Sequence, residues 1–209
     1  MIYITGDTHG DFTRFSAKRL RRTGMELTKE DYIIICGDFG LCWAKDKTFE
    51  YHCKNFAEKP YTILWVQGNH ENYDMIGEYP LEEWHGGKAG GPRSCRQREN
   101  CRRACAIWND NHYEVDYVIT HCCASTLQDL INAGTGRSCA PDLLTDYLGT
   151  LEQKLHYRHW YFGHYHRDCQ PDERHTLVYY AILPLEQKES ASAVPVPGQT
   201  EGETNHGKR

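Results

Sequence analysis

The chain has 209 residues, with 24 Lys or Arg against 29 Asp or Glu, so its formal net charge is −5. This length suits one α/β domain with a sizeable core, and the acidic balance gives no general electrostatic case for nucleic acid or an anionic membrane. No apolar run approaches the roughly 18 residues of a membrane helix, and the N-terminal segment lacks the features of a secretory signal. We therefore expect a cytoplasmic protein with reduced cysteines.

The first third of the chain alternates strand and helix patterns. Short apolar runs that include β-branched residues predict buried strands at residues 2–5, 32–36 and 62–66. The segments between them predict helices over residues 12–24 and 45–59, and Pro60 would stop the second helix. This order favours parallel strands joined by right-handed crossovers.

Residues 86–106 interrupt this regular pattern. They include four glycines, three cysteines and six Lys or Arg against one Glu, with neither a helical nor a strand period. The composition favours an irregular linker. A basic loop that attracts phosphate groups is the alternative, but no aromatic residues are interleaved with the basic ones, as they are in many nucleic-acid-binding surfaces.

The rest of the chain returns to strands and one clear helix. Strands are predicted at residues 117–120, 159–162 and 176–183, and a helix at residues 143–158. From residue 186 the composition changes to Glu, Ser, Pro, Gly, Thr and Lys, which cannot bury apolar surface. We therefore expect one domain over residues 1–185 and a disordered polar tail over residues 186–209.

Five of the predicted strands each lead into side chains that can bind a metal. The candidate ligands are Asp7 and His9, then Asp38, then Asn69, then His121, and finally His164 and His166. Strands with a common direction would place these residues at one edge, where open α/β folds bind ligands. Oxygen and imidazole ligands without thiolates suit a hard or borderline divalent metal, and seven of them suffice for two ions with positions left open.

Each motif taken singly has an ordinary structural explanation. A lone Asp after a strand is usually a helix cap or a turn former, and motif matches carry false positives. Five motifs in order, each at the end of a predicted strand, are much harder to explain by chance. Within them, Asp7 and His9 stand at i and i+2 and face the same way on an extended segment, while Asp38 has two oxygens and can bridge two ions.

The motifs Gly6-Asp7-Thr8-His9-Gly10, Gly37-Asp38, Gly68-Asn69-His70-Glu71, His121 and Gly163-His164-Tyr165-His166 resemble those of the calcineurin-like metallophosphoesterases. The resemblance covers about residues 1–185 and implies an α/β sandwich of two mixed β-sheets flanked by helices. It also implies a centre of two divalent ions, with manganese first and iron or zinc as alternatives. In similar proteins the stretch between His70 and His121 is longer and carries another strand pair, so part of one sheet is expected to be missing here.

The same resemblance implies a role for each site residue. The first metal would be held by Asp7, His9 and His166. The second would be held by Asn69, His121 and His164, with Asp38 as the bridge. His70 would not be a ligand but a catalytic residue that stabilises or protonates the leaving oxygen, and a free imidazole beside the metals suits that task. Glu71 would orient its neighbours.

These observations predict a metal-dependent phosphoesterase. It would hydrolyse a phosphomonoester or phosphodiester through attack by a metal-activated hydroxide. Its partner would be a phosphorylated substrate: a small molecule, a nucleotide, a protein or a nucleic acid. The alternative is a non-catalytic binding protein that keeps the fold, with the site distorted by residues 86–106.

Overall fold

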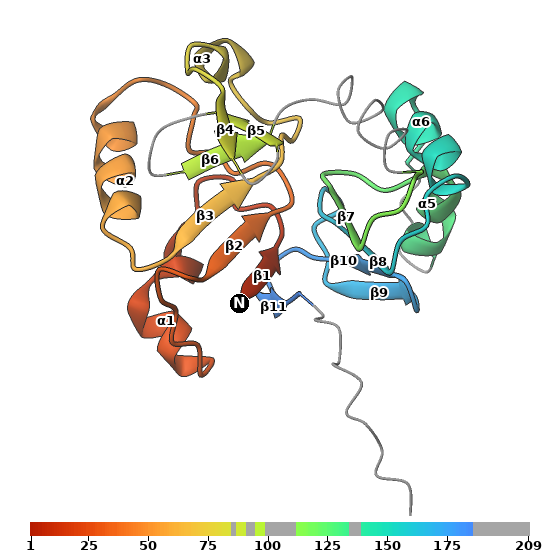
Figure 1. Cartoon of the computed structure of the whole chain (residues 1–209), viewed down its shortest axis with the longest axis horizontal. Coiled ribbons are helices and arrows are strands. Elements are labelled where there is room, and N and C mark those ends of the chain that lie inside the picture. Colours follow the sequence, from red (N-terminus) through yellow and green to blue (C-terminus); the bar gives the residue numbers. More distant parts are fainter. Residues whose placement is uncertain (85–86, 91–94, 99–111, 134–138, 186–209) are drawn as a thin grey trace, which may run out of the picture.

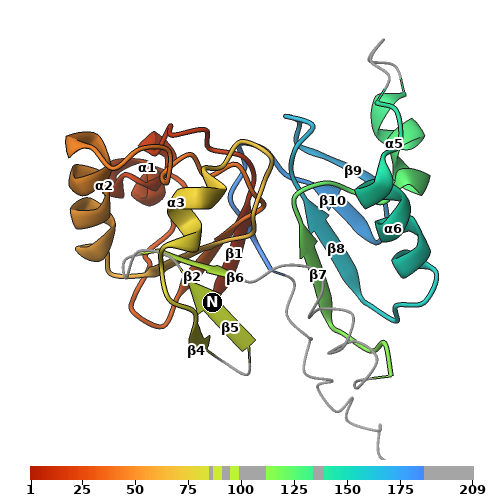
Figure 2. The same cartoon turned by 90° about the horizontal axis from the view of Figure 1, so that it is seen from above.

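The computed structural model describes residues 1–84, 87–90, 95–98, 112–133 and 139–185. Two β-sheets face each other, and helices cover their outer sides (Figure 1). Seen from above, α1 (Ala17–Arg22) and α2 (Lys47–Ala57) lie outside the first sheet, while α5 (Ser125–Asn132) and α6 (Leu143–Glu152) lie outside the second (Figure 2). This is the predicted sandwich of two sheets flanked by helices.

Within the described residues, the first sheet has seven strands in the order β11-β1-β2-β3-β6-β5-β4. Its centre consists of the parallel strands β1 (Ile2–Thr5), β2 (Tyr32–Ile35) and β3 (Thr62–Trp65), while β11 (Leu183–Pro184) runs antiparallel to β1. The short elements η1 (Thr13–Phe15) and α3 (Tyr73–Gly77) follow β1 and β3. Because β1, β2 and β3 are parallel, their carboxyl ends reach the same edge.

The second sheet has four strands in the order β7-β8-β10-β9. Here β7 (Tyr117–Thr120), β8 (His159–Phe162) and β10 (His175–Leu177) are parallel, and β9 (Cys169–Asp172) pairs antiparallel with β10. Both sheets are therefore mixed. The strands predicted at residues 2–5, 117–120 and 159–162 have the predicted bounds.

The expected irregular linker over residues 86–106 is wrong for the residues described there, which form strands, while the expected loss of a strand pair relative to similar proteins stays a prediction. Strand β5 (Gly87–Gly90) pairs antiparallel with β4 (Glu82–Trp84), and β6 (Cys95–Arg98) joins β5 to the parallel strand β3. Without β6, the backbone groups on that side of β3 would be unpaired, and such groups can pair with a segment that has no side-chain period. Residues 86, 91–94 and 99–106 lie outside the described part, as does the predicted tail.

Three buried clusters hold the layers together. One lies between the first sheet and its helices, and a second between the second sheet and α5 and α6. The third joins the two sheets and contains Ile4, Cys36, Tyr161 and Val178, each at most 3% exposed. These residues come from the ends of β1 and β2 and from β8 and the end of β10, so the inter-sheet contact fixes the loops that follow those strands.

Two further findings concern the chemistry of the chain. None of the helices in the described ranges is long and apolar enough to cross a membrane. All seven cysteines for which the structure gives a state are free thiols.

Candidate metal centre

The predicted ligands meet in loops at the carboxyl ends of five strands. Asp7 and His9 follow β1, Asp38 follows β2, and Asn69 follows β3. From the facing sheet, His121 follows β7, and His164 and His166 follow β8. The centre therefore lies between the two sheets, and each sheet supplies part of it.

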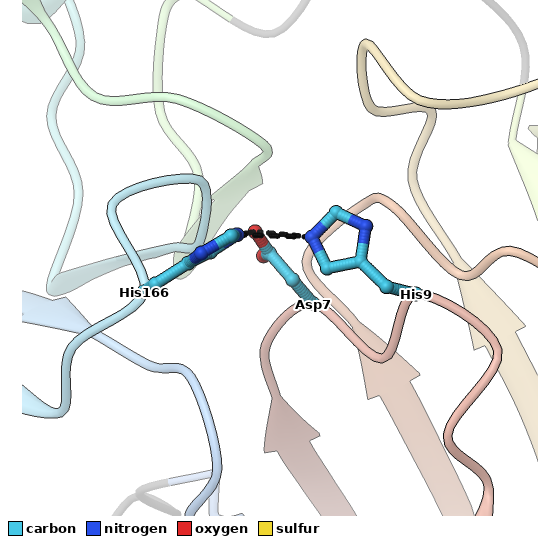
Figure 3. Close-up of side chains that lie close together, drawn as sticks. All are labelled: Asp7, His9 and His166. Carbon is cyan, nitrogen blue, oxygen red and sulfur yellow. Dashed lines mark hydrogen bonds and ion pairs between the residues drawn. The ribbon is translucent and has the colours of Figure 1, made fainter.

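Asp7, His9 and His166 form one group of ligand atoms, all within 4.8 Å of one another (Figure 3). His166 Nε2 lies 3.1 Å from Asp7 Oδ2, and His9 Nε2 lies 3.9 Å from the same oxygen. The two imidazole nitrogens are 2.9 Å apart. Nitrogen ligands about 2.0–2.1 Å from a zinc-type ion lie roughly 3 Å from each other, so this spacing suits a shared ion.

Asp7, Asp38 and His121 form a second group within the same 4.8 Å limit. His121 Nε2 lies 3.3 Å from Asp38 Oδ2, 2.9 Å from Asn69 Oδ1 and 3.2 Å from His164 Nδ1. Oxygen and nitrogen donors therefore surround one imidazole nitrogen. The predicted second set therefore lies close together, and its donors are those that divalent cations take, while its role as a ligand set stays a prediction.

Asp38 lies between the two groups. Its Oδ2 atom is 3.3 Å from His121 Nε2 and 3.8 Å from His9 Nε2. The other oxygen, Oδ1, accepts a hydrogen bond of 2.7 Å from the backbone amide of His70. This position suits the bridging role, which stays a prediction.

Three glycines leave room for the ligands. A Cβ atom would lie 2.2 Å from His121 Nδ1 at Gly37, 2.1 Å from Asp38 Oδ1 at Gly68 and 2.2 Å from Asp7 Oδ1 at Gly163. Such approaches are far inside van der Waals contact. No role was predicted for these glycines, although each directly precedes a predicted ligand, and this position could have identified them from the sequence.

Backbone groups orient the ligand side chains. The amide of His164 donates to both oxygens of Asp7, at 3.0 and 3.1 Å. His121 Nδ1 lies 2.7 Å from the carbonyl oxygen of Cys36 and therefore carries the proton, which leaves Nε2 free to face the other donors. The carboxylates and imidazoles are thus held in place by the peptide chain itself.

The electrostatics of the site favour an ionised carboxylate at Asp38 and neutral imidazoles at His9 and His164. Burial pushes the pKa of Asp38 up, but the hydrogen bond and charge of His121 outweigh it and lower the pKa to about 2. Burial pushes the pKa of His121 down, but the hydrogen bond to Asp38 and the charges of both aspartates raise it. Burial lowers the pKa of His9 and of His164, which favours their neutral, metal-binding form.

His70 and Glu71 point in different directions. His70 is exposed, with its ring centroid 5.4 Å from that of His9. Glu71 is 8% exposed, and its Oε1 accepts a hydrogen bond of 2.9 Å from the amide of Phe39. Burial raises the pKa of Glu71 to about 7. Glu71 therefore fixes the loop after β2, while His70 stays at the open rim of the site.

A family model described as calcineurin-like phosphoesterase matches residues 1–168 of the chain. The chain belongs to the calcineurin-like phosphoesterase family. The matched range includes His70 and every predicted ligand. This phosphoesterase therefore belongs to a group of metal-dependent hydrolases with dinuclear centres, and its Asp and His clusters could hold metals. Among curated proteins, no sequence matches it significantly.

Proposed function

We propose that this protein hydrolyses a phosphomonoester or a phosphodiester with the help of two divalent ions, for which manganese is the first candidate. The convergence of ligand atoms from both sheets carries the proposal. Asp7 belongs to both groups of candidate ligands, and three donor atoms lie together around Nε2 of the His121 imidazole. Together with family membership, this arrangement supports a catalytic centre more than a structural metal site.

Each residue has a place in this proposal. The first ion would be held by Asp7, His9 and His166. The second would be held by Asn69, His121 and His164, with Asp38 between them. When bound, a pair of such ions orients the phosphate, neutralises its charge and supplies a nucleophile from water at neutral pH.

His70 is proposed to move the proton that the leaving group needs. Its backbone amide is anchored to Asp38, so its place relative to the ligands is fixed, while the exposed ring faces away from the buried core. An imidazole can hold and release a proton at neutral pH, and an N–H of the His70 ring would donate it to the departing oxygen. The buried Glu71 would keep the neighbouring loop in position through the Phe39 amide.

The alternative function, a non-catalytic binding protein, depended on a site distorted by residues 86–106. In the described part of that segment, β5 and β6 extend the first sheet, and the ligand atoms still converge. Among the described residues, this arrangement speaks against the distortion on which the alternative depends. Phosphatases for small molecules, nucleotides or proteins and nucleases share this site chemistry, so a test needs substrates of both ester classes.

The test is a metal-dependence assay on the full chain. Protein stripped with a chelator and reloaded with Mn²⁺ should hydrolyse p-nitrophenyl phosphate or its bis-ester, and fresh chelator should abolish the activity. Asp38→Asn should be inactive, whereas Asp74→Asn, an exposed aspartate on α3, should match the parent. Stoichiometric Mn²⁺ binding without hydrolysis of either ester would favour the binding protein, and no Mn²⁺ binding would refute the dinuclear centre.

A further inference from the structure

Arg14 is a buried cation that contacts the backbone of the predicted ligand Asp7. It lies on η1 and is 3% exposed. Burial of a charge is unfavourable unless hydrogen bonds compensate for the lost water. The hydrogen-bond partners of Arg14 are neutral, namely three backbone carbonyls and one hydroxyl, so the guanidinium organises the backbone around it.

The two ends of the guanidinium group hold the strand that leads into the site. Nη1 donates to Thr5 Oγ1 at 3.0 Å and to the Gly6 carbonyl at 3.3 Å. Nη2 donates to the carbonyl of Asp7 at 3.0 Å. Three consecutive residues at the end of β1, the last of them a predicted ligand, are therefore fixed by one side chain.

The same Nη1 atom also reaches the second sheet. It donates to the carbonyl of Tyr179, two residues after β10, at 2.5 Å. The two segments can approach because residue 6 is a glycine: a Cβ there would lie 2.0 Å from the carbonyl oxygen of Val178. Arg14 thus connects a backbone segment after β1 with one after β10, at a point where the two segments pack tightly.

Tyr179, whose carbonyl binds Arg14, contacts the predicted ligand His166 through its ring. Its ring stacks on the ring of His166, with centroids 4.8 Å apart and an angle of 21° between the planes. Its amide donates to Asp168 Oδ1 at 2.8 Å, which ties the Tyr179 backbone to the segment just after His166. The position of His166 therefore depends on that of Tyr179, and through its carbonyl on Arg14.

We infer that Arg14 is a positioning residue for the first metal group, because it sets the spacing between Asp7 on one sheet and His166 on the other. The inference rests on the proposed function, since it concerns affinity for the metal. A planar guanidinium fork reaches the Asp7 and Tyr179 carbonyls together, whereas the single nitrogen of a lysine cannot reproduce that geometry. Groups that orient metal ligands typically change affinity by about 10–100-fold when they are lost.

The experiment is an equilibrium titration with Mn²⁺, in which the free ion is followed by electron paramagnetic resonance. Arg14→Lys should weaken one of the two sites by about 10–100-fold and leave the other at the parent value. Arg19→Lys is the matched control, because Arg19 lies 4.8 Å from the Tyr180 ring, as Arg14 does, but is exposed. Leu20→Ala, a nearby core substitution, should lower the melting temperature without changing either affinity.

The outcomes separate this inference from the proposed function. If the parent binds two Mn²⁺ ions and Arg14→Lys binds both with unchanged affinity, the positioning role is refuted and the proposed function stands. If the parent binds no Mn²⁺, both are refuted. Should Arg14→Lys fail to fold, Tyr179→Leu is measured in its place, because it removes the ring that stacks on His166. Weaker Mn²⁺ binding at one site then supports the inference, and unchanged affinities at both sites overturn it.

Discussion

At the scale of single residues, the candidate centre is built on an unusual backbone. Four of the predicted ligands have a positive φ: 46° at His9, 48° at Asp38, 73° at His164 and 50° at His166. This conformation is uncommon outside glycine, although Asp and His adopt it more readily than most residues, and it is disfavoured by about 1–3 kcal/mol per residue. Backbone hydrogen bonds offset the strain: for example, the Asp38 carbonyl accepts from the amides of Thr8 and His9 at 3.1 and 2.9 Å. Strain held in this way at several neighbouring residues is typical of a functional site.

The role of His70 can be separated from metal binding by substitution. His70→Ala should retain both Mn²⁺ ions but slow turnover by roughly 10²–10⁴, the usual effect of losing a positioned acid or base. The loss should be largest for alkyl phosphates, whose leaving groups need a proton, and smaller for p-nitrophenyl phosphate. Parallel Mn²⁺ titrations and kinetics on both esters measure this. Loss of metal in proportion to activity would instead make His70 a ligand.

The glycine at residue 68 should be indispensable for steric reasons. A Cβ there would lie 2.1 Å from Asp38 Oδ1 and 2.4 Å from the Asp38 backbone nitrogen, so no side-chain rotation relieves the clash. Gly68→Ala should therefore lose Mn²⁺ affinity and activity. Gly77→Ala is the control, because nothing lies within 4 Å of its Cβ position at the end of α3.

Both glycine variants are compared by Mn²⁺ titration and urea unfolding. Gly77→Ala should match the parent in affinity and unfold with a free energy equal to it or higher by up to about 1 kcal/mol, since alanine favours helix. Parent-like Mn²⁺ binding by Gly68→Ala would show that the loop after β3 can move away without disturbing Asp38.

At the scale of secondary-structure elements, the local sequence pattern predicted the strands that carry the ligands. It missed strands that form through pairing with a neighbouring strand and have no apolar run of their own. The runs at residues 117–120 and 159–162 are apolar and include β-branched or aromatic residues, and they form strands with the predicted bounds. Strand β9 contains Pro171 and has no such run; it lies at a sheet edge, where proline is tolerated. The helix expected over residues 143–158 ends at Glu152.

The single strand expected over residues 176–183 is divided for a specific reason. The carboxylate of Asp168 accepts hydrogen bonds from the amides of Tyr179, Tyr180 and Ala181, at 2.8, 3.1 and 3.2 Å. Those amides are therefore unavailable to a sheet, and β10 ends at Leu177. The contact between Arg14 and Tyr179 likewise joins separate parts of the chain. These two residues are 165 positions apart, and no local pattern predicts their contact.

A buried histidine links β10 to β9 and to α6 and should make stability depend on pH. His175 Nδ1 lies 2.8 Å from the carboxylate of Asp172, and Nε2 lies 2.8 Å from the hydroxyl of Tyr157 and 3.4 Å from Glu152. Burial pushes the pKa of His175 down, but the hydrogen bonds to Glu152 and Asp172 outweigh it and raise the pKa. The hydrogen bond from His175 holds the pKa of Glu152 below its usual value, and the pKa of Asp172 is also lowered, because hydrogen bonds from Arg174 and His175 outweigh burial.

The signs of these shifts define a pH window. A raised histidine pKa stabilises the fold fully below about pH 6.5, and this contribution is lost as pH rises through the folded-state pKa. The lowered carboxyl pKa values stabilise the fold above about pH 4, and this contribution is lost as pH falls through the folded-state pKa values of the carboxyl groups. His175→Gln should therefore reduce the free energy of unfolding most near pH 5–6, by about 1.5–3 kcal/mol, and less above pH 8. Urea unfolding at both pH values checks this, with the exposed His156→Gln as control; a pH-independent difference for His175→Gln would contradict it.

At the scale of the whole molecule, the centre lies where two sheets with separate cores meet. Each sheet packs its own helices (Figure 2), and the contact between the sheets has a smaller buried cluster of its own. The predicted ligands come from both sides: Asp7, His9, Asp38 and Asn69 from the first sheet, and His121, His164 and His166 from the second. Bound metal would therefore join the two halves directly, in addition to the apolar contact.

Metal binding should consequently stabilise the folded chain. A ligand that binds the folded state alone adds about 2.7 kcal/mol when its concentration is 100 times its dissociation constant. For a chain of this size, that corresponds to a rise in melting temperature of about 5–10 °C, and the rise should continue with the logarithm of the Mn²⁺ concentration. Thermal melts of chelator-treated protein over a series of Mn²⁺ concentrations measure the effect. Asp7→Asn should melt without this rise, because Asp7 belongs to both ligand groups and its carboxylate also orients the loop of His164. An unchanged melting temperature of the parent across that series would show that no metal bridges the two sheets, whereas an equal rise in Asp7→Asn would place the bound ions elsewhere on the molecule.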